Sequence, residues 1–148
     1  MPDETRAETC PSQVAVNIFI KTIPFANMRY PSVGDYFIDH MDDGTEVLVV
    51  CIARLGNWRY EACVTIHELV EIFIVKHQGI PFEKIDRFDE AFERRRKKGN
   101  TDEPGDDPRA PYKFAHCIAS GVERVVAAVL GVSWKKYEAV CDKLMEGK

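Results

Sequence analysis

Three segments in the first third of the chain have the β-branched and aromatic composition that is typical of strands. They cover residues 14–23, 35–39 and 45–53. The sequence Asp-Asp-Gly at 42–44 supplies turn residues between the last two segments and predicts a hairpin. The third segment is apolar on both faces at its centre, which indicates a central strand or a strand that a helix covers.

The rest of the chain has the hydrophobic spacing of helices, with apolar positions that recur every three or four residues. Asn57 is expected to cap the first helix and Ser133 the last, while Gly79 and Pro81 end the first. The stretch rich in Gly, Pro and Asp at 99–111 is predicted to be a loop within the domain and a candidate lid. The predicted helices cover residues 58–78, 81–98, 112–130 and 134–145.

Strands followed by helices predict an α+β fold, in which a small, mostly antiparallel sheet packs on a buried helix with two or three further helices around it. The chain has 148 residues, of which 45% are hydrophobic and 30% charged, and this is enough for one globular domain. We expect that domain to cover residues 13–148, after a flexible polar tail at 1–12.

Charge and cysteine content exclude several classes of protein. Twenty basic residues against 24 acidic residues give a net charge of −4, so the chain lacks an overall basic field for nucleic acid. Its apolar runs are too short to cross a membrane, and its polar start does not have the pattern of a signal peptide. The five cysteines include no Cys-x-x-Cys pair, so we expect free, mostly buried thiols in a cytoplasmic protein.

The most informative segment is the nearly apolar stretch at 62–75, which contains His67, Glu68 and Glu71. Burying an unpaired carboxylate costs several kcal/mol, so these side chains require an explanation. His67 and Glu71 lie about 40° apart around a helix and could bind one metal ion. Glu68 lies about 100° from His67 and could take a proton from a water on that ion.

The sequence His67-Glu68-Leu69-Val70-Glu71 resembles the HExxH helix of the zincin metallopeptidases. The resemblance implies that His67 is a zinc ligand and that Glu68 is the general base. Glu71 replaces the second histidine of the motif and can also ligate zinc. The segments ACVTIHELVE and PRAPYKFAHC are also similar to small uncharacterised phage and prophage proteins, a likeness that implies no activity.

His116, near the start of the third predicted helix, is the best candidate for the third ligand. Two His and one carboxylate form a known catalytic zinc set, and some non-haem iron sites use the same ligands. We therefore expect Zn²⁺, with Fe²⁺, Mn²⁺ or Mg²⁺ as alternatives. Glu123, seven residues after His116, is expected to orient His116 or to pair with Arg124 or another arginine. If His116 is not the third ligand, Glu123 and His77 are the next candidates.

The remaining histidines fit less well. His77 follows His67 by ten residues, a ligand spacing of the metzincins, but Ile74 stands where those proteins need a glycine. If the helix continues, His77 lies about 15 Å from His67 along the axis and cannot share the ion. His40 falls in the hairpin and is expected to be exposed.

This ligand set predicts a zinc-dependent hydrolase that cleaves a peptide or other small amide. Metal-activated water would be the nucleophile and Glu68 the general base. Arg109 and Tyr112 flank the loop that leads to His116, and both are candidates for stabilising the developing oxyanion. Simple packing is the alternative role for Tyr112.

Three alternatives remain open at this point. Arginines could neutralise Glu68 and Glu71 without any metal; the candidates are Arg54, Arg59, Arg109 and Arg124. The Glu68-x-x-Glu71 spacing also fits a Mg²⁺-dependent nucleotide pyrophosphatase, with further carboxylates from Asp86, Asp89 or Glu90, although His67 then has no role. The third alternative is a non-catalytic, metal-stabilised binding protein.

Overall fold

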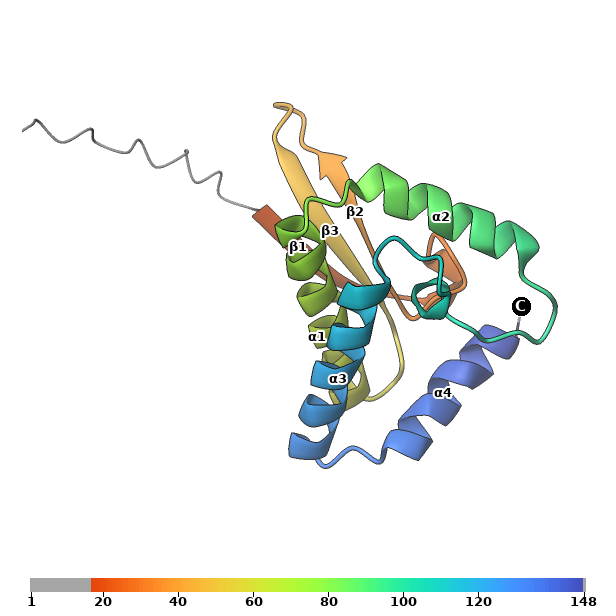
Figure 1. Ribbon diagram of the computed structural model, residues 1–148. Coiled ribbons are helices and arrows are strands. Elements are labelled where there is room, and N and C mark those ends of the chain that lie inside the picture. Colours follow the sequence, from red (N-terminus) through yellow and green to blue (C-terminus); the bar gives the residue numbers. More distant parts are fainter. Residues whose placement is uncertain (1–16, 148) are drawn as a thin grey trace, which may run out of the picture.

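The computed structural model describes residues 17–147, which form one three-stranded sheet and four α-helices. Figure 1 shows their arrangement. The predicted α+β class is confirmed. The expected tail at 1–12, the start of the first predicted strand at 14–16 and Cys10 lie outside the described residues. The elements are β1 (Asn17–Ile23), β2 (Gly34–His40), β3 (Glu46–Ala53), α1 (Trp58–His77), α2 (Phe82–Arg95), α3 (Lys113–Val129) and α4 (Trp134–Glu146), with short 3₁₀ helices η1 (Phe25–Asn27) and η2 (Pro104–Asp106).

The strand order is β1-β3-β2, so the apolar strand β3 is central, as its sequence predicts. β2 and β3 form the predicted antiparallel hairpin, and Gly44 takes the positive φ of 82° that the turn requires. β1, however, pairs with β3 in parallel, with Ile18 beside Leu48. The sheet is therefore mixed, and the expectation of a mostly antiparallel sheet is wrong. The chain between β1 and β2 carries them to opposite edges of β3, an arrangement that local turn signals do not reveal.

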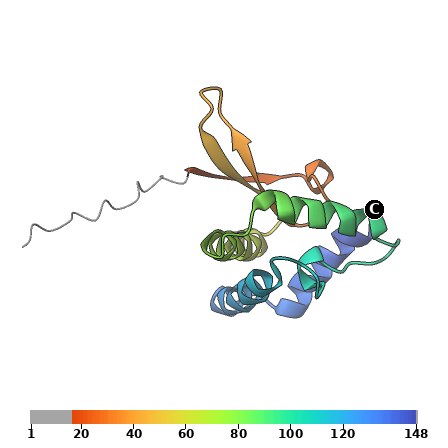
Figure 2. The same cartoon turned by 45° about the horizontal axis from the view of Figure 1, so that its top comes forward.

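Helix α1 lies between the sheet and α3 (Figure 2). The face of β3 with Leu48, Val50 and Ile52 packs into the main core, which takes residues from the sheet and from all four helices. The opposite face of β3 forms a smaller apolar cluster with Met28. Because α1 has neighbours on two sides, it is apolar around most of its circumference, and its few polar side chains are held inside the protein.

Most helix boundaries follow the predicted signals. The side chain of Asn57 accepts a hydrogen bond of 3.0 Å from the backbone N–H of Arg59 and caps α1. Ser133 occupies the N-cap position of α4, but its side chain makes no capping hydrogen bond. Helix α2 ends at Arg95, three residues before the predicted end at 98, and the guanidinium of Arg96 turns back to Glu93 at 2.7 Å.

The described cysteines are free thiols. Cys51 and Cys63 are buried as predicted, whereas Cys117 is exposed and Cys141 is half-buried. No helix within residues 17–147 combines the length and the apolar character needed to span a membrane.

Candidate metal centre

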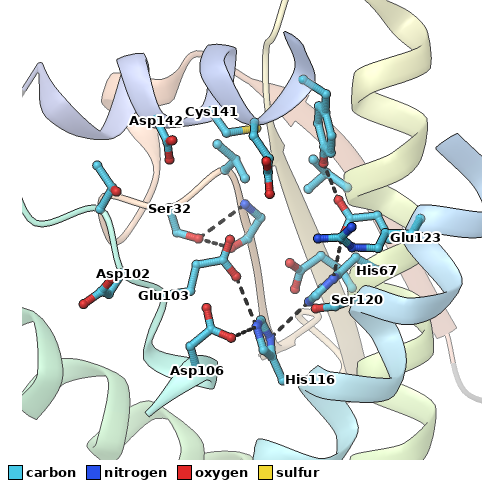
Figure 3. Close-up of a pocket in the computed structure, with 18 of the residues that line it drawn as sticks. Ser32, His67, Asp102, Glu103, Asp106, His116, Ser120, Glu123, Cys141 and Asp142 are labelled. Carbon is cyan, nitrogen blue, oxygen red and sulfur yellow. Dashed lines mark hydrogen bonds and ion pairs between the residues drawn. The ribbon is translucent and has the colours of Figure 1, made fainter. Parts of the chain in front are cut away.

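The packing of α1 against α3 brings five polar side chains together in the interior. Helix α1 supplies three of them and α3 supplies two. None is more than 9% exposed, although imidazoles and carboxylates are costly to bury. The five residues are His67, Glu68, Glu71, His116 and Glu123, and Figure 3 shows His67, His116 and Glu123 at the wall of a cavity.

Three atoms of this cluster form a nearly equilateral triangle. His67 Nε2 lies 3.2 Å from His116 Nδ1 and 3.3 Å from Glu71 Oε2. The third side, from His116 Nδ1 to Glu71 Oε2, is 3.0 Å. Ligand atoms about 2.0 Å from a tetrahedral zinc ion are about 3.3 Å from one another. The triangle therefore has the size expected for three ligands of one small cation.

The far side of His67 is held by a second carboxylate. Its Nδ1 lies 2.8 Å from Glu123 Oε2, and the Tyr137 hydroxyl donates a hydrogen bond of 2.5 Å to Glu123 Oε1. The Tyr36 hydroxyl likewise donates to Glu71 Oε1 at 2.8 Å. With the proton of His67 on Nδ1, the lone pair of Nε2 points into the triangle, as in many metal-binding histidines.

Glu123 thus contacts His67, and the expectation that it orients His116 or pairs with Arg124 is wrong. His116 Nε2 instead faces the loop at 99–111, with Glu103 Oε2 at 3.3 Å and Asp106 Oδ1 at 3.4 Å. Backbone from the same loop fixes the ring, because a Cβ at Gly105 would lie 2.5 Å from His116 Nδ1.

Glu103 offers a second way to complete a ligand set with the two histidines, since one ligand atom from each of the three residues lies within 4.8 Å of the others. This set is looser than the triangle that includes Glu71. The side chain of Glu103 is also 52% exposed, whereas that of Glu71 is 5% exposed. Glu71 is therefore the better candidate for a third ligand, and Glu103 lies on the outer side of His116.

The shifted pKa values of the cluster residues show that the cluster favours bound positive charge. Burial opposes a charge on His67, but Glu123 and Glu71 outweigh that effect and raise the pKa of His67 to about 11. Burial alone would raise the pKa of Glu71, but His116 and His67 hold that pKa below its usual value. Without a metal, protons on the imidazoles supply the positive charge that the carboxylates require.

Glu68 differs from the other four residues because no hydrogen bond or ion pair links its carboxyl group to another residue in the described chain. Burial raises the pKa of Glu68 well above its usual value, and the nearby charge of Glu71 adds to this effect. The carboxyl group lies against Gly34 of β2, where the Cβ of any larger residue would collide with it. Glu68 borders two cavities, so its carboxyl group is available to a ligand.

The larger cavity has a volume of about 350 Å³ and lies between α1, α3, α4 and the loop at 99–111 (Figure 3). His67, Glu68 and His116 border it, so a small molecule in this cavity would reach the cluster. A smaller cavity of about 60 Å³ lies beside Glu68 and Glu71 and extends towards Asp89 of α2.

The two candidates for oxyanion stabilisation are each paired with an aspartate outside the triangle. The Arg109 guanidinium binds the Asp107 carboxylate at 2.7 Å on the surface, and Arg109 borders neither cavity described above. Tyr112 is buried, and its hydroxyl donates a hydrogen bond of 2.7 Å to Asp89. Its ring meets the His116 ring edge-on with 6.3 Å between centroids, which agrees with the packing role.

His77 and His40 are both exposed. Helix α1 continues to His77, so this residue lies at the far end of the helix from the cluster, as expected for an unbroken helix. His40 lies 3.7 Å from Glu46 across the hairpin.

The alternative of an arginine network is wrong for the part of the chain that the structure describes. No Arg or Lys between residues 17 and 147 forms an ion pair with Glu68, Glu71 or Glu123. Arg109 binds Asp107, while the guanidinium groups of Arg59 and Arg124 lie over tryptophan rings. Among the described residues, Glu71 and Glu123 therefore have only histidines and tyrosines as partners.

The carboxylates that a pyrophosphatase site would use are dispersed. Asp86 pairs with Arg29 at 3.1 Å, and Glu90 is half exposed beside Arg94. Asp89 alone of the three candidates borders the smaller cavity with Glu68 and Glu71. His67, which that alternative leaves without a role, lies at the centre of the cluster.

Sequence reasoning missed Tyr36, Tyr137 and Glu103 as members of this site. The two tyrosines stand in ordinary apolar patterns, and no spacing links them to the glutamates that they contact. Glu103 had one signal, its place in the acidic loop that leads to His116.

A comparison of the chain with models of protein families, with curated proteins and with solved structures gives no match. The geometry of the cluster is therefore the basis for a functional argument.

Proposed function

We propose that the protein is a zinc-dependent hydrolase whose single metal ion is held by His67, Glu71 and His116. The observation that supports this proposal is the triangle of Nε2, Oε2 and Nδ1 atoms, with sides of 3.0–3.3 Å. Protons on the imidazoles can link each histidine to Glu71 Oε2 but leave the two ring nitrogens facing each other at 3.2 Å, whereas one metal ion would contact all three atoms.

The donor set favours zinc. Two imidazoles and one carboxylate suit Zn²⁺, Fe²⁺ and Mn²⁺, whereas Mg²⁺ prefers a shell of oxygen ligands. The residues behind the ligands also fit a metal centre, since Glu123 and Tyr36 orient His67 and Glu71. Three protein ligands would leave a fourth position for water, as in catalytic zinc sites.

A bound zinc ion would lower the pKa of a water ligand to about 7 and so supply a nucleophile at neutral pH. Glu68 borders the cavity, and the charge of the zinc ion would oppose the burial that raises its pKa. It is therefore the group that would accept the proton of that water. The cavity of about 350 Å³ would admit a peptide or another small amide to this position. The resemblance to the zincin helix suggests the same roles for His67 and Glu68.

The test is the metal content of protein purified without added metal. We expect about one zinc per chain by elemental analysis, and we expect a chelator to lower the melting temperature until zinc is restored. His116→Ala should abolish binding, whereas the matched variant His77→Ala, at an exposed histidine, should retain the metal. A metal-free protein whose melting temperature is the same with and without added zinc would refute the proposal.

A further inference from the structure

The larger cavity has a strongly acidic boundary. Carboxylates from the loop at 99–111 and from α4 line it (Figure 3), and two of them, Glu103 and Asp106, also reach the outer nitrogen of His116. We call this set the acidic rim; it consists of Asp102, Glu103, Asp106, Glu138 and Asp142.

Within the described chain, no lysine or arginine side chain pairs with a carboxylate of the acidic rim. Lys113 reaches the loop, but its Nζ donates to the backbone carbonyl of Asp106. Among residues 17–147, Arg124 is the one Arg or Lys that borders the cavity, and its guanidinium lies 4.4 Å from the centroid of the Trp134 ring. The negative charge of the rim therefore has no counter-charge from lysine or arginine.

Two residues of the acidic rim destabilise the helix on which they lie. Glu138 and Asp142 are four residues apart on α4, and both are exposed. Like charges at this spacing repel each other and destabilise a helix. A cation in the cavity would attract both carboxylates and offset this repulsion.

Glu68 gives independent evidence for a ligand at the same place. It is only 9% exposed, it borders the cavity from α1, and its carboxyl group has no partner among residues 17–147. Acidic groups thus extend from the wall beside the metal cluster to the opposite side of the cavity. A zinc ion at the triangle would keep one positive charge after Glu71 is counted, which could not balance the five carboxylates of the rim.

We propose that this cavity binds the ammonium or guanidinium group of a peptide that carries lysine or arginine. The step from binding to cleavage rests on the function proposed above, while the binding itself depends only on the rim. A volume of about 350 Å³ suits one long side chain and part of its backbone. The rings of Trp134 and Tyr137 border the cavity and offer apolar surface to the methylene groups of that side chain.

The test compares the binding of four short peptides to the protein by titration calorimetry, with and without bound zinc. The peptides are acetylated tripeptide amides with lysine, arginine, norleucine or glutamate between two alanines. We expect the lysine and arginine peptides to bind at least about fivefold more tightly than the norleucine peptide, and this preference to weaken as salt is added. Equal affinity for lysine and norleucine would overturn the proposal.

Substitutions then assign the preference to the acidic rim. Glu138→Gln with Asp142→Asn should reduce the preference for lysine over norleucine to less than about twofold, and both positions are exposed, so folding should not suffer. Glu83→Gln with Glu90→Gln on α2 changes the net charge equally and should retain the preference. A full preference in the first double variant would show that the rim is not the binding site.

The same measurements separate the two proposals. A rim-dependent preference in a protein that holds no zinc would support the cationic ligand and refute the hydrolase. A zinc-containing protein without any preference for cationic peptides would refute the cationic ligand and leave the metal site intact.

Discussion

His67 and Glu123 meet across the interface between α1 and α3, with 2.8 Å between Nδ1 and Oε2. This contact decides which nitrogen of His67 faces the triangle, because a proton shared with Glu123 leaves Nε2 free as a ligand. Glu123 is in turn held by Tyr137 of α4. Three helices therefore cooperate in the orientation of one imidazole.

Replacement of Glu123 by glutamine should weaken zinc binding without removing a ligand. The amide cannot supply the negative charge that makes the imidazole a stronger donor, so we expect affinity to fall about 10–100-fold. Competition with a chromophoric chelator measures the change, and circular dichroism checks the fold. Glu83→Gln, on the surface of α2, is the control, and equal affinity in the two variants would contradict the role of Glu123.

The two buried glutamates of α1, Glu68 and Glu71, should separate metal binding from catalysis. Glu68→Gln should keep one zinc per chain and lower the rate of amide hydrolysis about 10²–10⁴-fold, the usual contribution of a general base. Glu71→Gln should lose most of the metal, because it removes the charged ligand of the triangle. Loss of zinc in Glu68→Gln would show that Glu68 is a ligand and not the base.

Gly105 should be essential for the position of His116. The Cβ of an alanine at this position would lie 2.5 Å from Nδ1 and 2.8 Å from Cδ2 of the imidazole, so the ring or the loop must move. We expect Gly105→Ala to lower zinc affinity as strongly as the loss of a ligand does. Isothermal titration of metal-free protein with zinc would measure the affinity.

Gly121 provides the matched control for this experiment. It lies within α3, as His116 does, but a Cβ at Gly121 meets no other atom within 4 Å. Gly121→Ala should therefore leave zinc binding unchanged and raise the free energy of unfolding by about 0.4–1 kcal/mol. If Gly105→Ala also bound zinc normally, His116 would not be held by the loop in the way that the structure indicates.

The strands and helices were predictable because each has a local signal. The apolar centre of β3 predicted its central place, and Asn57 predicted the start of α1. The parallel pairing of β1 was not predictable in the same way, because it depends on the path of residues 24–33 around β3. Turn residues report only on neighbouring strands.

The candidate site was predictable in part for the same reason. His67 and Glu71 are one helical turn apart, so their spacing alone places them on one face, and the structure brings His116 to that face from α3. The partner of Glu123 could not be derived, since it depends on how α3 is rotated against α1. That rotation directs Glu123 to His67, whereas helical spacing suggested a link to His116.

Asp89 should make the free energy of unfolding depend on pH through its own titration, separately from the titration of the triangle residues. Burial raises the pKa of Asp89 from 3.8 to about 7, with smaller contributions from Glu71 and Asp35, although the hydrogen bond from Tyr112 opposes the change. The folded protein thus holds this proton more tightly than the unfolded chain does. The resulting stabilisation is complete below pH 3.8 and is lost as the pH rises through about 7.

Urea unfolding of wild-type protein and Asp89→Asn between pH 4 and pH 8 tests this expectation, with a chelator present so that metal does not change the field of Glu71. The free energy of unfolding of the wild type, relative to the variant, should fall between about pH 4 and pH 7, with a slope of at most about 1.4 kcal/mol per pH unit, and then remain constant. Parallel curves for the two proteins would show that Asp89 titrates as an ordinary exposed carboxylate. In that case solvent reaches the smaller cavity freely, and the buried state of the neighbouring Glu68 would also need to be reconsidered.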